Sequence, residues 1–344
     1  MISVTGSQFG TVDLAGPSTD GVRVAYASYG PEDAPAVMVL GGISAHRFVC
    51  GGEDGTPGWW PGVVGPDGNL TSGEDKLTSG EPVLTPGPYR ILGMDYIGGA
   101  GGSSAPVNGP GVPIVTTADQ ADGVKAVLGH LGIDKLHAFV GASYGGMVGL
   151  ALGARHPDRL ERLLVFCAAH RSHPMATGLR GLQRRIVELA ADAGRESEGL
   201  ALARELAMTT YRTPEEFEKR FVSVPIWEEG SPHFAVERYL KVQGERFARH
   251  FDGRAFAILS QSLDLHDVDP ALIRVPTTVV SVDSDTLVPP WLVAELVRGL
   301  PDTGRTIRIA SNFGHDAFLK AKKVVGRVIR HVLDEEPPSA KAVE

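Results

Sequence analysis

The pentapeptide GASYG at 141–145 is the feature that most narrows the folds open to this chain. A run typical of a buried strand, LHAFV at 136–140, leads into it, and the pattern at 147–155 predicts a helix leaving it. Glycines at both ends let strand and helix approach closely, and such a turn pushes Ser143 clear of the sheet, where its hydroxyl can react. The pentapeptide alone is weak because Gly fills 43 of 344 positions, so a plain glycine-rich turn is the competing interpretation.

The rest of the chain alternates short apolar runs with helical patterns, which predicts βαβ units and a mainly parallel sheet. TADQ at 117–120 has capping-box spacing and predicts the start of one such helix. The predicted strands lie at 22–29, 36–40, 89–94, 136–140, 162–167, 277–282 and 306–309. Helices are predicted at 121–131, 147–155, 291–300 and 324–332.

Between 172 and 265 the strand signals stop and amphipathic helical patterns take over, with TPEE at 213–216 as a helix start. We therefore predict a discontinuous α/β core at 1–171 and 266–336, and a helical lid at 172–265. The end at 337–344 is polar, and we expect a flexible tail there. The segment 50–88 is rich in Gly, Pro, Ser, Thr and Asp and predicts an unusually long loop.

Composition excludes several classes of partner. A formal net charge of −8 provides no basic field for nucleic acid. Neither a membrane-spanning apolar run nor a signal-like N-terminus is present, so we expect a cytoplasmic protein without a membrane partner. Cys50 and Cys167 are too few for a disulfide framework and lack the spacing of a zinc site, so no metal is expected.

The partners that would activate Ser143 follow it in the expected order. A serine nucleophile on such a turn needs an acid and then a histidine, each on a loop after a later strand. The strand at 277–282 opens into Asp283 and Asp285, and the strand at 306–309 opens into His315. Either aspartate can orient the imidazole, with the other capping the turn. This order predicts the α/β-hydrolase fold and covalent acyl transfer through Ser143.

An acyl-transfer site also needs backbone N–H donors for the oxyanion. Tyr144, directly after the nucleophile, is expected to supply one. The loop GGIS at 41–44 follows a buried strand, so Ile43 or Ser44 is expected to supply the second. A plain tight turn explains the two glycines equally well.

With these elements placed, the chain resembles the α/β-hydrolase-type homoserine O-acyltransferases of methionine biosynthesis, which move an acetyl or succinyl group from coenzyme A to an amino-acid hydroxyl. The resemblance covers about 22–333, and the family's acid motif falls on Asp285 rather than Asp283. The segments that carry it are RVAYASYG at 23–30, GWW at 58–60, GASYGGM at 141–147, LQR at 182–184, TYR at 210–212, VERYL at 236–240, DTLVP at 285–289 and GHDAFL at 314–319.

The same resemblance implies substrate-binding roles. Arg212 resembles the family's arginine that grips the amino-acid carboxylate, Asp316 the carboxylate that holds the ammonium, and Tyr239 a pocket tyrosine on the lid. Without the resemblance, Arg212 reads as a surface arginine and Tyr239 as a core residue. It further implies acyl-CoA as co-substrate, a small amino-acid substrate and no bound cofactor. Homodimers are usual in the family.

Three functions compete on this reading. The first is a ping-pong acyltransferase acting on homoserine or serine. The second is an esterase that uses the same three residues with water as acceptor. The third is a non-catalytic binding module, which an intact set of three residues disfavours. The sequence leaves acetyl and succinyl donors equally open.

Overall fold

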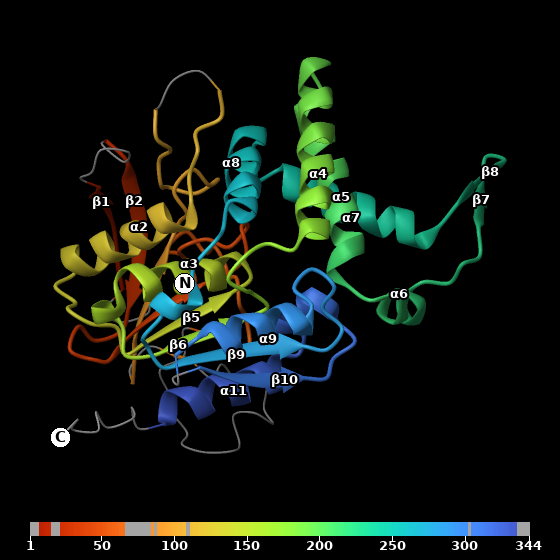
Figure 1. The fold of residues 1–344 in the computed structure, drawn as a ribbon. Helices are drawn as coiled ribbons and strands as arrows, with labels where there is room; N and C mark the ends of the chain where they lie inside the picture. Colours follow the sequence, from red (N-terminus) through yellow and green to blue (C-terminus); the bar gives the residue numbers. More distant parts are fainter. Residues whose placement is uncertain are drawn as a thin grey trace, which may run out of the picture.

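An eight-stranded sheet forms the centre of the molecule (Figure 1). The computed structural model describes residues 7–14, 21–65, 84–85, 88–107, 111–301 and 304–335. The strand order is β1-β2-β4-β3-β5-β6-β9-β10; the β1–β2 and β2–β4 pairs are antiparallel and the other pairs are parallel. The mainly parallel sheet is therefore confirmed. The expected tail at 337–344 and most of the loop predicted at 50–88 lie outside the described residues.

The predicted bounds of two central strands, β3 and β9, match the structure to the residue. Every residue of both is buried, as expected for a parallel strand covered on both faces, and β9 buries Thr277, Thr278 and Ser281 together with its valines. Strand β1 was not predicted, since it is an edge strand with partly exposed residues. The strands are β1 (Gln8–Asp13), β2 (Arg23–Tyr29), β3 (Ala36–Leu40), β4 (Arg90–Met94), β5 (Ala138–Ala142), β6 (Leu163–Phe166), β9 (Thr277–Val282) and β10 (Gly304–Ile309).

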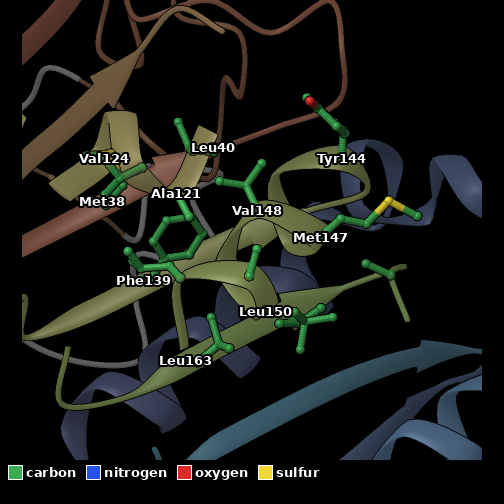
Figure 2. Close-up of a cluster of buried hydrophobic side chains, with 14 of the residues drawn as sticks. Met38, Leu40, Ala121, Val124, Phe139, Tyr144, Met147, Val148, Leu150 and Leu163 are labelled. Carbon is green, nitrogen blue, oxygen red and sulfur yellow. The ribbon is translucent and has the colours of Figure 1, made fainter. Parts of the chain in front are cut away.

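Helices cover both faces of the sheet, as successive strand residues show. Met38 packs with Val124 and Phe139 in the core on one face (Figure 2), whereas its neighbour Val37 belongs to the core on the other. In the described part of the chain, no helix combines the length and apolar character needed to cross a bilayer. The first face is covered by α2 (Thr117–His130), α3 (Tyr144–Arg155) and α9 (Pro290–Gly299), and the second by α11 (Lys322–Asp334).

Helices replace the sheet between β6 and β9, as predicted for the region 172–265. We call residues 174–264 the helical insertion. Thr213 is the N-cap of α6 and accepts a hydrogen bond from the Glu216 N–H, also as predicted. That the insertion acts as a lid stays a prediction. Its helices are α4 (Pro174–Asp192), α5 (Glu196–Tyr211), α6 (Pro214–Arg220), α7 (Ala235–Ala248) and α8 (Gly253–Asp264).

The expectation that the insertion lacks strands is wrong in one place. Strands β7 (Ile226–Glu228) and β8 (Ser231–His233) pair as a hairpin at the end of an arm that extends away from the sheet (Figure 1). Each strand has only three residues and almost all are exposed, so the alternation that marks a half-buried strand is missing from the sequence.

The capping box of α2 lies one residue earlier than TADQ predicts. Thr116 is the N-cap, and Asp119 at the third helical position accepts a hydrogen bond from its backbone N–H. The two residues expected in these roles are engaged elsewhere. Thr117 pairs through Oγ1 with His266 Nδ1, and Gln120 pairs with the Ile97 backbone.

Candidate active site

Ser143 lies at the junction between β5 and α3, in a backbone conformation that few non-glycine residues adopt. Its φ is 54° and its ψ is −120°. The turn is tight enough that a Cβ at position 141 would lie 2.4 Å from the Gly145 carbonyl oxygen, and one at 145 would lie 2.2 Å from that of Leu40. Both glycines are therefore required, and a strained backbone of this kind persists only where the surrounding structure enforces it.

Three loops bring the predicted nucleophile, base and acid together. His315 Nε2 is 2.9 Å from Ser143 Oγ, and His315 Nδ1 is 2.8 Å from Asp285 Oδ2. Asp285 lies after β9, and His315 lies in the short 3-10 helix Gly314–Asp316 after β10. The other oxygen of Asp285 accepts hydrogen bonds from the backbone N–H groups of Leu287 and Val288, each at 2.9 Å. These contacts fix the carboxylate in one orientation.

The choice between the two aspartates is clear from their contacts. Asp283 is exposed and accepts hydrogen bonds from the Arg308 guanidinium at 2.7 and 2.9 Å. Asp285 is 2% exposed and faces the imidazole. The residue singled out by the family resemblance is therefore the one that contacts His315.

The surroundings of His315 favour its protonated form. Burial lowers the pKa of His315, but Asp285, through its charge and hydrogen bond, and the charge of Asp316 outweigh burial and raise the pKa. Cys167 lies beside the same carboxylate, and burial first and Asp285 second hold the pKa of its thiol well above the usual range. A histidine that accepts a proton readily, next to a serine hydroxyl, is the arrangement of a general base.

Cys167, Asp285 and His315 also bring three ligand-type atoms within 4.8 Å of one another, all buried. Asp285 and His315 already share a hydrogen bond, and the thiol is held in its protonated form. Metal ligands must be deprotonated and free of such bonds. These residues therefore fit a proton relay better than a metal site.

The expected oxyanion loop lies directly against the turn that carries Ser143. The Gly41 carbonyl accepts hydrogen bonds from the Gly145 N–H at 2.8 Å and from the Tyr96 hydroxyl at 2.5 Å. Ile43 and Ser44 line the same cavity as Ser143, and no described hydrogen bond uses either of their N–H groups.

Tyr144 can offer only its backbone N–H to a ligand at Ser143. It begins α3, so its N–H belongs to the first helical turn, where N–H groups have no partner within the helix. Its side chain is fully buried and bonds Ser262 Oγ through the hydroxyl at 2.6 Å. The phenol is therefore not available to a ligand.

A cavity of about 190 Å³ opens on Ser143 and His315. Its lining combines the core loops with the inner faces of α4, α5 and α8. Among the residues that the resemblance assigned to substrate, Asp316 lines the cavity, whereas Arg212 and Tyr239 do not.

Arg212 and Asp316 nevertheless form one cluster beside the base. Arg212 Nε donates to Asp316 Oδ2 at 3.0 Å, and its Nη1 lies 3.4 Å from Glu216 Oε1. The guanidinium carbon lies 5.8 Å from the centre of the Tyr239 ring. All three predicted residues are thus brought together, but the arginine already contacts two carboxylates.

Sequence reasoning missed three arginines that line the cavity, Arg171, Arg180 and Arg204. Arg180 shares one face of α4 with Ala176 and Gln183, and this face turns inward because α4 packs against α5 and α8. Helical periodicity identifies such a face, but an arginine on it is read as solvated until the neighbouring helix is known.

Comparisons with known proteins agree with the fold. The family model described as alpha/beta hydrolase fold matches residues 82–322. A homoserine O-succinyltransferase of Xanthomonas campestris pv. campestris is 43% identical over 300 residues, which is 87% of this chain and 75% of the relative. A homoserine O-acetyltransferase of Clavibacter michiganensis subsp. michiganensis is 33% identical over 369 residues, covering 94% of this chain and 91% of the relative.

Two solved structures are similar in fold. The homoserine O-acetyltransferase of Staphylococcus aureus has a TM-score of 0.77 at 24% identity, with 96% of each chain covered. Esterase E22 has a TM-score of 0.79 at 18% identity, with 95% of this chain and 100% of the other covered. At these identities the likeness shows the fold alone, and the same fold serves both transfer and hydrolysis.

Proposed function

Because the chain belongs to the homoserine O-acyltransferases of the α/β-hydrolase fold family and is an O-acyltransferase, we propose that it moves an acetyl or succinyl group from acyl-CoA to the hydroxyl of homoserine or serine. The observation that carries the proposal is the chain of contacts from Asp285 through His315 to Ser143 at the cavity. In the resembled family this reaction belongs to methionine biosynthesis.

In the first half-reaction, His315 Nε2 takes the proton from Ser143 as its Oγ attacks the thioester carbonyl carbon. The oxyanion that forms accepts hydrogen bonds from the backbone N–H groups of Tyr144 and of Ile43 or Ser44. The carbon–sulfur bond then breaks, and His315 returns its proton to the coenzyme A sulfur. The products are free coenzyme A and an acyl-serine.

The second half-reaction reverses these roles. His315 takes the proton of the acceptor hydroxyl, whose oxygen attacks the acyl-serine carbonyl. The bond to Ser143 Oγ breaks, the proton returns to that oxygen, and the O-acyl amino acid leaves. Asp285 stabilises the imidazolium in both halves without itself taking the proton.

The acceptor is a zwitterion, and the Arg212–Asp316 cluster offers one group for each of its charges. The described contacts of Asp316 use Oδ2 alone, which leaves Oδ1 for the ammonium. The described contacts of Arg212 use Nε and Nη1, which leaves Nη2 for the carboxylate. The guanidinium lies over the Tyr239 ring, in a cation–π contact.

A single-turnover experiment tests the mechanism. Mixing the protein with acyl-CoA in the absence of acceptor should add one acyl mass to the peptide that contains Ser143. Ser143→Ala should abolish this adduct and the transfer reaction, whereas the matched control Ser197→Ala, at an exposed position of α5, should retain both. Transfer at the wild-type rate by Ser143→Ala would contradict the mechanism.

Hydrolysis is tested in the same assay by the choice of acceptor. The rate of coenzyme A release should rise by about 100-fold or more when homoserine or serine is added, because the acceptor attacks from a bound position whereas water must enter the cavity. A rate that does not respond to either amino acid would identify water as the acceptor and the protein as an esterase.

A further inference from the structure

The cavity that opens on Ser143 contains more positive than negative charge. Arg171, Arg180 and Arg204 line it, and the only carboxylate among the lining residues that the structure describes is Asp316. Asp316 is itself paired with an arginine outside the lining, as described above. A cavity with this surplus selects for a substrate that carries an additional negative charge.

Two of the three arginines are paired with neighbouring carboxylates. Arg171 binds Glu295 through Nε and Nη2 at distances of 2.9–3.1 Å. Arg180 binds Asp264 at 2.7 Å, although Asp264 is also bound by Arg184 at 2.7 Å, so this pair of arginines shares one carboxylate. Arg180 and Arg184 together therefore carry one more charge than the carboxylate that they share.

Arg204, on α5, has a different environment. Its guanidinium carbon lies 5.3 Å from the centre of the Tyr211 ring and 5.0 Å from that of Phe247. No ion pair or hydrogen bond to a carboxylate is found for it in the described ranges. Two aromatic rings hold the guanidinium in place without using its N–H donors, which leaves these donors for a ligand.

Arg204 and His315 lie beside the same aromatic ring, that of Tyr211. The Tyr211 ring centre lies 6.1 Å from that of His315, and Tyr211 itself lines the cavity. One aromatic ring thus separates the guanidinium from the base. In a succinyl group, two methylenes place the distal carboxylate about 4 Å beyond the thioester carbonyl carbon, so the carboxylate extends from the reacting centre into the cavity that Arg204 also lines.

The cluster assigned to the acceptor is distinct from Arg204. Although Arg212 follows Tyr211 directly, its guanidinium turns to Asp316 and Glu216, whereas Arg204 contacts Tyr211 and Phe247. An amino acid has one carboxylate, and the Arg212 cluster accounts for it. The donors of Arg204 are left for the other substrate.

We infer that Arg204 binds the distal carboxylate of a dicarboxylic acyl group, which makes the protein specific for a succinyl-type donor over an acetyl donor. The inference rests on the proposed acyl transfer through Ser143. Arg204 contacts the acyl group but does not take part in making or breaking bonds. It therefore changes the relative rates of acylation by different donors.

The acylation half-reaction, measured without acceptor as the burst of coenzyme A release, tests this assignment. Wild-type protein should react with succinyl-CoA at a kcat/KM at least about 10-fold above that with acetyl-CoA. Arg204→Gln should lower the succinyl-CoA value by about 10- to 100-fold, the range expected for a hydrogen bond between charged groups. It should leave the acetyl-CoA value within about twofold.

Two further variants complete the design. Arg204→Lys should recover part of the succinyl-CoA rate, because it keeps the charge but loses the planar fork. Arg185→Gln removes an exposed arginine of the same insertion and should change neither donor. A ligand measurement covers the case in which variants fold poorly: free succinate should raise the melting temperature of the wild type more than acetate at equal concentration.

Several outcomes would overturn the assignment. If Arg204→Gln lowered kcat/KM equally for succinyl-CoA and acetyl-CoA, Arg204 would bind the coenzyme A moiety that both donors share. If it left acylation unchanged and raised the KM for homoserine, Arg204 would bind the acceptor. Wild-type preference for acetyl-CoA would also reject it while leaving the proposed function intact. Failure of both donors to form an acyl-enzyme would instead reject the mechanism through Ser143.

Discussion

Replacing Asp285 by asparagine tests the relay through a change of a single non-hydrogen atom. The backbone N–H groups of Leu287 and Val288 both donate to Asp285 Oδ1 at 2.9 Å, so the oxygen of the new amide must take that position. Its NH2 group then occupies the position of Oδ2, 2.8 Å from His315 Nδ1. Since this NH2 can only donate, Nδ1 must accept, and the ring proton moves to Nε2. The imidazole then donates to Ser143 instead of accepting its proton.

The expected loss follows from this wrong tautomer. Asp285→Asn should lower the acylation rate constant by about 10³- to 10⁴-fold, which corresponds to about 4–5.5 kcal/mol on the barrier. Binding of acyl-CoA should change little, because no contact of the cavity is removed. Rapid-quench measurement of the acyl-enzyme separates the two quantities. Asp283→Asn is the matched control: its carboxylate binds Arg308 on the surface, and the variant should retain the rate within about twofold.

The same substitution has a signature in pH dependence. Burial lowers the pKa of His315, but the charge and the hydrogen bond of Asp285 outweigh burial, so that the pKa of His315 is raised. Without this charge the pKa falls, so the acidic limb of kcat/KM for acylation should move to lower pH. Because the folded-state pKa lies above the unfolded value of about 6.5, the contact stabilises the fold fully below that value and progressively less as pH rises through the folded pKa.

The relay as described would be refuted by either of two results. One is an Asp285→Asn variant that keeps more than a tenth of the wild-type acylation rate constant. The other is a larger loss in Asp283→Asn than in Asp285→Asn, since the surface carboxylate has no contact with His315.

Three further substitutions separate structural from chemical roles. Gly145→Ala, whose Cβ would lie 2.2 Å from the Leu40 carbonyl oxygen, should destabilise the fold by about 3 kcal/mol or more in urea unfolding. Gly178→Ala, with open space around it in α4, should instead stabilise the fold by about 0.5–1 kcal/mol. The reverse order of stability would contradict the close approach at Gly145. Tyr144→Phe should cost about 1–2 kcal/mol of stability, because its buried partner Ser262 loses a hydrogen bond. The variant should keep kcat within about threefold. A large loss of kcat would mean that the Tyr144 hydroxyl takes part in the reaction. Arg212→Lys should raise the KM for the amino-acid acceptor by about 10-fold and leave acylation unchanged; an effect on acylation alone would contradict the acceptor assignment.

The sequence predicted structure best where a segment is buried along its whole length and its pattern does not depend on distant parts of the chain. The bounds of β3 follow from a continuous apolar run and those of β9 from a short run of β-branched residues. The positions of Ser143, Asp285 and His315 follow from the strand ends that precede them. These signals need only the order of elements along the chain.

The predictions failed where distant parts of the chain decide the local structure. The capping box shifted by one residue because Thr117 bonds His266, which lies 149 positions away, and no local pattern contains that contact. The role of Arg204 was invisible for the same reason. Its side chain faces a cavity only because α5 packs against α4 and α7, and the two rings that hold it come from α5 and α7.

The place where the helical insertion leaves and re-enters the core has an evolutionary consequence. It departs after β6 and returns before β9, and these two strands are direct parallel neighbours in the sheet. The strands and loops that hold Ser143, Asp285 and His315 are therefore connected through the sheet itself and do not depend on the insertion for their arrangement. Changes in 174–264 can alter which acyl group or amino acid is accepted while the geometry of bond making is inherited unchanged.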